Sequence, residues 1–243
     1  MHGVRELLLT WPGDRDGLVA FQRELGRHEP PAWRPGSEPL VAGVFMCSGR
    51  SCCDAAWAGA AGVRGRRIEC RSTVAGRPGA PYEAGLLALR EGPLLEAAVR
   101  ALGAEPDAII VNATGRDHPR RAGLAVHLGA VLGIPTVGVT NRPLAASGDW
   151  PGEGRGLASP LLLEGEVVGA WVRTRAGARP VAVHPGWRTD VETAIHVVVD
   201  ASAGARTPLP IREARRLART ARAVVEGLVG PGRKMGSADP GVR

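Results

Sequence analysis

A strict alternation of helical and strand-like apolar runs between residues 86 and 139 limits the folds available to this chain. Residues 86–102 and 118–132 carry apolar side chains at helical spacing, whereas 108–112 and 136–139 are short apolar runs. Strands that alternate with helices form parallel sheets, and the helices cover the faces of those sheets. This part of the chain is therefore predicted to be a parallel sheet covered by helices.

The segments on either side of this region follow a different rhythm. Three strand-like runs at 40–47, 53–63 and 67–74 are separated by short turns rich in glycine and arginine, which is typical of an antiparallel meander. The remaining predicted elements are a helix at 12–26, a hairpin at 161–173, a strand at 181–184 and helices at 190–200 and 211–228. We expect one domain over residues 1–230 and a flexible Gly/Pro tail over 231–243.

Composition and charge restrict the class of partner. With 44% apolar residues the chain can build a core, and it has no apolar run long enough to cross a membrane and no signal-peptide layout, so a cytoplasmic protein is expected. The net charge is +7, and Lys234 is the only lysine. Arginine binds phosphate, sulfate and carboxylate in bidentate fashion, so we expect a nucleic acid, an anionic metabolite or an acidic protein as partner.

Three motifs carry a resemblance to a known family. They read PYEAGLLALREGP at 81–93, VNATGRDHPRRAGLAVHLG at 111–129 and IPTVGV at 134–139. In order and spacing they resemble the endonuclease V family, in which a Pro-Tyr-x-Pro-Gly wedge precedes the first motif's helix; the equivalent residues 82–85 are called the wedge loop below. The resemblance spans roughly residues 11–200. It implies an α/β, ribonuclease H-like mixed sheet, antiparallel in its first three strands and then parallel, with helices on both faces.

The resemblance also implies a chemistry, which several residues contradict. Members of the family require Mg²⁺ and hydrolyse the second phosphodiester on the 3′ side of deoxyinosine, or of inosine in RNA. Of the three principal carboxylates Glu91 is retained, while Phe45 and Asn112 replace the other two. Asn141 stands where the family has a lysine, and Trp187 stands where it has a late histidine. Because Mg²⁺ prefers carboxylate oxygens, we expect no bound metal and no other cofactor, unless Asp117, Glu83, Asp190 or Glu192 rebuilds the site.

Several polar groups are expected to line the same cleft. Glu91 is a candidate general acid or base, or else a structural carboxylate. His118 is a candidate anion donor or a helix cap, and His184 takes over part of the lost histidine's role. The catalytic candidates are therefore Glu91, His118, His184 and Asn112. The substrate-binding candidates are Tyr82, Arg90, Arg120, Phe45, Cys47, Asn141 and Trp187. Three of them have an alternative interpretation: Tyr82 as a packed tyrosine, Arg120 as a solvated arginine and Cys47 as a buried thiol.

From these substitutions the leading hypothesis is a metal-independent enzyme in specialised metabolism. Phe45 and Trp187 are expected to make the former metal position apolar, which suits loss of phosphate or sulfate from a small metabolite by elimination or ring-closing displacement. A carrier protein or a small partner subunit is expected to present that substrate. Nucleic acid is less favoured, because Glu83 and Ala84 alter the wedge loop. The alternatives are an inactive nucleic-acid-binding homologue and a true deoxyinosine endonuclease with rearranged ligands.

Overall fold

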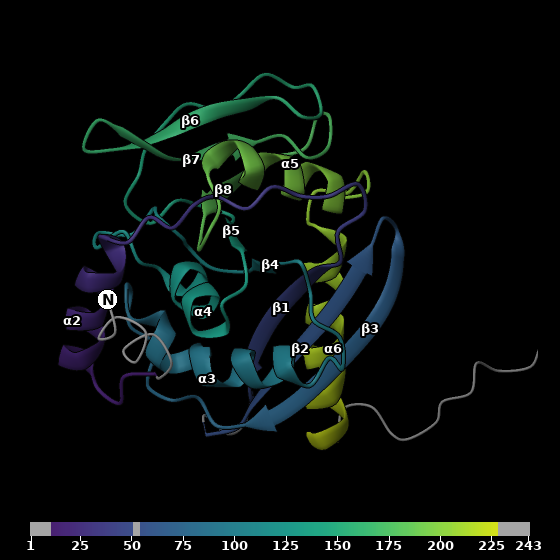
Figure 1. The fold of residues 1–243 in the computed structure, drawn as a ribbon. Helices are drawn as coiled ribbons and strands as arrows, with labels where there is room; N and C mark the ends of the chain where they lie inside the picture. Colours follow the sequence, from purple (N-terminus) through teal and green to yellow (C-terminus); the bar gives the residue numbers. More distant parts are fainter. Residues whose placement is uncertain (1–10, 51–53, 228–243) are drawn as a thin grey trace, which may run out of the picture.

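One mixed sheet runs through the molecule (Figure 1). The computed structural model describes residues 11–50 and 54–227. Within them the sheet has eight strands in the order β3-β2-β1-β4-β5-β8-β7-β6. Their bounds are β1 Val41–Ser48, β2 Ala56–Arg64, β3 Arg67–Gly76, β4 Ala108–Val111, β5 Thr136–Thr140, β6 Ala158–Leu163, β7 Glu166–Val172 and β8 Val181–Pro185.

The pairing of the strands confirms the predicted mixed α/β sheet. Strands β1, β2 and β3 form the antiparallel meander, and β1, β4 and β5 are parallel. Beyond β5 the sheet returns to antiparallel pairing, because β8 runs against both β5 and β7. The hairpin of β6 and β7 forms the far edge. The parallel section that the helix–strand alternation predicts is therefore confined to β1, β4 and β5.

Helices cover both faces of this sheet, as the resemblance implies. Their bounds are α2 Arg15–Gly26, α3 Leu87–Arg100, α4 Leu124–Leu132, α5 Val191–Ala201 and α6 Leu209–Val225. Helices α3 and α4 share a core with Ala42 and Val44 of β1, while α5 and α6 share a core on the other face with Val41 (Figure 1). Side chains alternate along a strand, so Phe45 and Cys47 point to the α6 face.

Helix α6 lies close to the sheet because glycines face it. A Cβ atom on Gly43 would be 2.3 Å from the carbonyl carbon of Pro210, and one on Gly59 would be 2.4 Å from the carbonyl oxygen of Ala214. Neither backbone position leaves room for a side chain. These two glycines therefore set how near α6 comes to β1 and β2.

The start of one helix differs from the prediction. Helix α4 begins at Leu124 and not at residue 118, because Arg121 has a φ of 56°, a left-handed conformation that interrupts a helix. The predicted tail, 231–243, lies outside the described residues. Within the described part of the chain, no helix combines the length and the apolar character that crossing a bilayer requires.

Candidate functional site

The carboxyl ends of β1 and β4 bring Phe45 and Asn112 together. Val44 and Val111 are partners in the parallel pairing of these strands, so the next residue on each strand lies beside the other. Ligand sites of parallel α/β sheets lie beyond the carboxyl ends of the strands. Two of the positions that the resemblance assigns to metal-binding carboxylates are thus neighbours, as expected.

Two arginines of α6 cover the Phe45 ring. The guanidinium carbons of Arg215 and Arg219 lie 5.0 and 5.7 Å from the ring centroid, within the range of cation–π attraction. Arg215 also makes a long hydrogen bond of 3.4 Å from its Nη2 atom to Oδ1 of Asn112. Burial, and to a lesser degree the charge of Arg219, lower the pKa of Arg215. The space beside the family's first carboxylate position therefore holds positive charge.

Glu91 lies half-buried on α3. Burial raises the pKa of its carboxyl from the ordinary 4.5 to about 7, although the charge of Arg90 opposes the rise. Arg90 itself donates to the carbonyl oxygen of Ala80 at 2.8 Å and to Oγ of Ser48 at 2.6 Å, so it joins α3 to the end of β1. The guanidinium predicted to bind substrate is therefore engaged in holding the fold. The raised pKa agrees with the expectation for a carboxyl at this position.

Cys47, two residues beyond Phe45, is half-buried as well. Burial raises the pKa of its thiol, and the opposing charges of Arg222 and Arg219 have a smaller effect. A raised pKa keeps the thiol protonated and unreactive. The interpretation of Cys47 as a packed thiol is favoured over that of a nucleophile.

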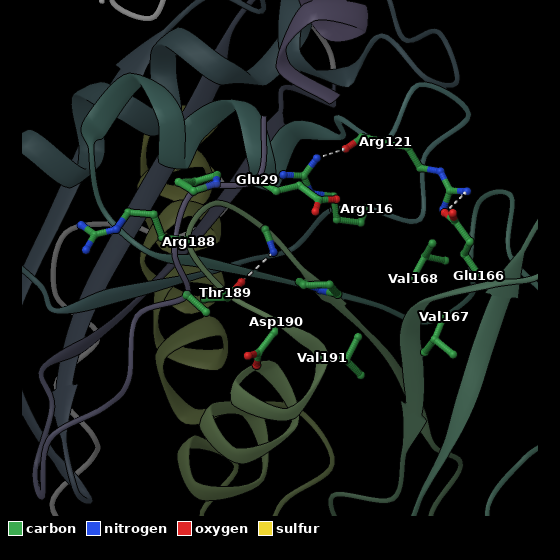
Figure 2. Close-up of a pocket in the computed structure, with 14 residues that line it drawn as sticks. Glu29, Arg116, Arg121, Glu166, Val167, Val168, Arg188, Thr189, Asp190 and Val191 are labelled. Carbon is green, nitrogen blue, oxygen red and sulfur yellow. Dashed lines mark hydrogen bonds and ion pairs between the residues drawn. The ribbon is translucent and has the colours of Figure 1, made fainter. Parts of the chain in front are cut away.

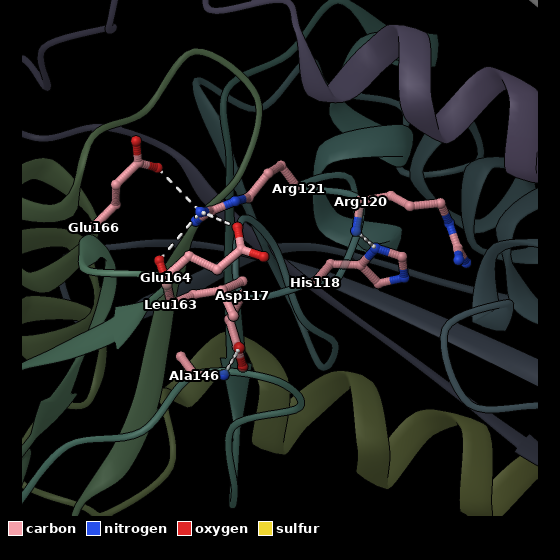
Figure 3. Close-up of polar contacts among 8 residues, drawn as sticks. All are labelled: Asp117, His118, Arg120, Arg121, Ala146, Leu163, Glu164 and Glu166. Atoms are coloured by element: carbon pink, nitrogen blue, oxygen red, sulfur yellow. Dashed lines mark hydrogen bonds and ion pairs between the residues drawn. The ribbon is translucent and has the colours of Figure 1, made fainter.

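His118 and Arg120 converge on one carbonyl oxygen, that of Gly85 in the wedge loop. His118 Nε2 lies 3.0 Å from it, Arg120 Nη2 lies 3.0 Å from it, and Gln22 Nε2 on α2 lies 3.1 Å from it. The Nδ1 atom of His118 accepts from the backbone N–H of Arg120 at 3.1 Å (Figure 3). His118 is therefore neutral with its proton on Nε2, and burial lowers its pKa to about 4.

This arrangement corrects the predicted roles of His118 and Arg120. His118 Nε2 and Arg120 Nη2 both bind the Gly85 oxygen, and Nε of Arg120 donates to Oε1 of Gln22 at 2.7 Å. An anion that bound His118 Nε2 would have to displace its bond to Gly85. Both side chains hold the wedge loop against α2, a role that needs no ligand and that the sequence spacing did not reveal.

His184 and Asp117 are fully buried. His184 Nε2 lies 2.9 Å from Oγ1 of Thr140, and its Nδ1 lies 3.7 Å from Oδ2 of Asp117. Asp117 accepts from the backbone N–H groups of residues 144–146 at 2.6, 2.9 and 2.6 Å, one of which Figure 3 shows. Burial lowers the pKa of His184 to about 4. These two residues connect β5, β8 and the loop at 144–146, beneath the surface on which a catalytic His184 would have to act.

Trp187 and Asn141 do not line the cleft as predicted. Trp187 is buried in a cluster with side chains of α2 and α4, so the prediction that it makes the metal position apolar is wrong. Trp187 stands at the position of the family's late histidine, but its larger apolar ring packs into the core and not into the cleft. Asn141 accepts a hydrogen bond of 2.8 Å from Arg206.

The carboxylates that were candidates for rebuilding a metal site are engaged elsewhere. Asp190 caps α5 and lies 2.6 Å from Nη1 of Arg34, and Glu83 lies 2.9 Å from Nη1 of Arg15. Asp117 is bonded to backbone as described. Among residues 11–50 and 54–227, no group of three or more His, Cys, Asp and Glu side chains, whether or not it contains Glu192, is placed to hold a metal ion.

Two pockets differ in their relation to this site. One of about 210 Å³ opens beside Asn112 and is lined by the wedge loop, His118 and the turn at 140–144, with Tyr82 71% exposed. A larger one of about 390 Å³ lies between Arg116, Arg121 and Glu166 and has none of the predicted site residues in its lining (Figure 2). In that pocket Arg121 is already paired with Glu166 at 3.0 Å. The smaller pocket is therefore the one that Asn112 lines.

Sequence reasoning missed Arg215 and Arg219. Their spacing of four residues on a helix predicts that they share a face. Nothing in the sequence places that face over Phe45, because the position of α6 depends on close contact with Gly43 and Gly59.

Comparisons with known proteins identify the relatives of this chain. The family model described as Endonuclease V matches residues 37–216. A protein of Geotalea uraniireducens named Endonuclease V is 45% identical over 148 residues, which are 61% of this chain and 63% of that relative, so the match spans less than two thirds of the relative's length. The solved Endonuclease V of Streptomyces avermitilis has a TM-score of 0.80 at 35% identity, covering 90% of this chain and 96% of that one.

A third comparison concerns a structure with bound nucleic acid. Ciona intestinalis Endonuclease V, in complex with a 24mer DNA containing an inosine followed by a ribo-adenosine, has a TM-score of 0.76 at 19% identity and covers 88% of this chain and 98% of that one. At this identity the likeness concerns the fold alone.

These relatives contradict the leading hypothesis from the sequence. A metal-independent enzyme on a small phosphorylated or sulfated metabolite, served by a carrier protein or a small subunit, has no support, because relatives at 45% and 44% identity are named for a nuclease. The prediction of a small anionic substrate as partner is contradicted as well, because solved structures of Ciona intestinalis Endonuclease V are complexes with DNA. The match of the family model over residues 37–216 outweighs the four substitutions. The alternative interpretations, which involve nucleic acid, are the ones favoured.

Proposed function

We propose that this chain, which belongs to the endonuclease V family, binds a nucleic-acid strand across the carboxyl ends of β1 and β4. The net charge of +7 favours a polyanionic partner. Tyr82, 71% exposed at the mouth of the 210 Å³ pocket, offers an aromatic face on which a base can stack. Proteins that act on a base take it out of the stack into a pocket, and this pocket opens beside Asn112.

We further propose that the strand is bound without metal-dependent cleavage. The observation that carries this proposal is the Phe45 ring, which lies under Arg215 and Arg219 where the family has a carboxylate. Phe45 offers no oxygen to a cation, and the single amide oxygen of Asn112 faces Arg215. Magnesium requires several oxygen ligands, and two guanidinium groups repel a divalent cation. The residues present do not fit Mg²⁺.

Glu91 does not change this conclusion. Glu91 has no acidic neighbour at position 45 or 112 with which to share a cation. It is also the single principal carboxylate that the chain retains.

A binding assay tests the first proposal. Fluorescence anisotropy of the full chain with a labelled inosine-containing single strand at about 50 mM salt is expected to show saturable binding that weakens as salt rises. The same strand with adenosine in place of inosine measures base preference. Absence of binding to either strand at this salt concentration would refute the proposal.

The second candidate is a true endonuclease, and the retained Glu91 together with the relatives' names favours it. Incubation of the inosine strand with Mg²⁺ or Mn²⁺ decides between the two. Intact substrate at protein excess agrees with binding alone. Nicking that scales with protein and disappears in Glu91→Gln would establish the endonuclease.

A further inference from the structure

A stripe of three arginines runs along α6 on the side that faces the end of β1. Arg215, Arg219 and Arg222 are spaced by four and three residues, so they share one side of the helix. The first two lie over Phe45, and Nη1 of Arg222 donates to the carbonyl oxygen of Ser48 at 3.2 Å. Three guanidinium groups are thereby brought to the carboxyl-terminal half of β1.

The arginines of this stripe are not paired closely with carboxylates, whereas other arginines nearby are. Arg216, on another side of α6, lies 2.7 Å from Glu213, which also binds Arg71 at 2.8 Å. Within the described part of the chain, Arg215 and Arg219 have no carboxylate within ion-pair distance, and Arg222 has Glu226 only at 3.9 Å. The buried Nε of Arg215 has no hydrogen-bond partner there either. The charges are therefore left facing one another.

The substitutions at the metal position account for this imbalance. A carboxylate in place of Phe45 or Asn112 would lie beside Arg215 and neutralise it. The aromatic ring instead holds the guanidinium groups by cation–π attraction, and within the described residues no carboxylate pairs with Arg215 or Arg219. Guanidinium groups bind phosphate with two parallel hydrogen bonds, and arginine clamps and metal ions serve the same purpose on phosphoryl groups.

We infer that Arg215 and Arg219, oriented by Phe45, form a phosphodiester-binding site that takes the place of the family's metal ions. The inference rests on the proposed function, because it assumes that a strand occupies the cleft. A phosphodiester bound between the two guanidinium groups relieves their mutual repulsion. The amide of Asn112 and the guanidinium group of Arg222 border the same site.

The test compares salt dependence of binding in matched variants. In the double variant Arg215→Gln/Arg219→Gln the affinity for the inosine single strand is expected to fall about tenfold for each arginine. The slope of log affinity against log salt is expected to become shallower by about 0.7, because the two guanidinium groups share one phosphate and each neutralised phosphate on a single strand contributes about 0.7. The control Arg66→Gln/Arg175→Gln removes two exposed arginines that do not belong to α6 and is expected to keep the wild-type slope.

The outcomes separate this inference from the proposed function. If the wild type does not bind, the proposed function fails. If the wild type binds and the 215/219 variant behaves like the 66/175 control, the proposed function stands and the arginine site is refuted. The variant Arg215→Lys/Arg219→Lys keeps the charge should the glutamine variant fail to fold. This lysine variant is expected to keep the wild-type slope, and its affinity is expected to fall because lysine cannot bind phosphate in bidentate fashion. An affinity equal to that of the wild type would also refute the site.

Discussion

Replacing Glu91 by glutamine is expected to stabilise the protein, and more so as pH rises. The carboxyl has a pKa of about 7 in the fold against an ordinary 4.5, because burial disfavours its charged form. Between these values the folded chain holds a proton that the unfolded chain has lost, so the wild type loses stability as pH rises through this window. At about 1.4 kcal/mol per pKa unit the full cost reaches roughly 3 kcal/mol above pH 7. Glutamine, which does not ionise, avoids it.

Urea unfolding of the wild type and Glu91→Gln between pH 5 and pH 8 measures this cost. The stability advantage of the variant is expected to grow from about 1 kcal/mol at pH 5 to about 3 kcal/mol at pH 8. Taking the difference between the two proteins cancels the titration of the buried histidines. Glu105→Gln, which removes an exposed carboxylate, controls for the loss of one negative charge. A difference that stays constant with pH would refute the assignment of Glu91 as a desolvated carboxyl.

Three further changes have defined outcomes. Gly59→Ala is expected to lower thermal stability by about 1–3 kcal/mol, because its Cβ would lie 2.4 Å from the Ala214 carbonyl oxygen, whereas Gly36→Ala meets no neighbour and should melt like the wild type. His127→Leu is expected to be less sensitive to acid than the wild type. Burial lowers the pKa of His127 from 6.5 to about 3, so the wild type loses stability as pH falls below 6.5. Urea unfolding is expected to show a loss of about 2 kcal/mol for the wild type at pH 5 that the variant does not show. Tyr82→Ala is expected to leave the melting temperature unchanged and to weaken strand binding by about 1–3 kcal/mol in anisotropy, and equal binding would exclude stacking on this ring.

The order of strands and helices could be predicted because hydrophobic spacing is local. The run at 108–112 and the helical pattern at 86–102 correspond to β4 and α3. The start of α4 could not be predicted, since a left-handed backbone at Arg121 depends on the turn that holds His118.

The candidate site was predictable only in part, because motif spacing gives positions along the chain and not contacts. Phe45 and Asn112 meet because both come directly after the parallel pairing of β1 with β4, which ends at Val44 and Val111. The occupation of His118 and Arg120 by Gly85 is a tertiary feature that no spacing reveals. The same holds for Arg215, whose place over Phe45 is set by the docking of α6.

The single oxygen of Gly85, contacted by Gln22, His118 and Arg120, joins three segments that are distant in sequence. A loop held at such a junction is already ordered before another molecule binds. It therefore loses little conformational entropy when a complex forms. The junction also means that any displacement of the Tyr82 segment must carry α2 and the turn at 118–120 with it. The wedge loop, α2 and the turn at 118–120 therefore meet a binding partner as one rigid unit, and the loop does not move independently.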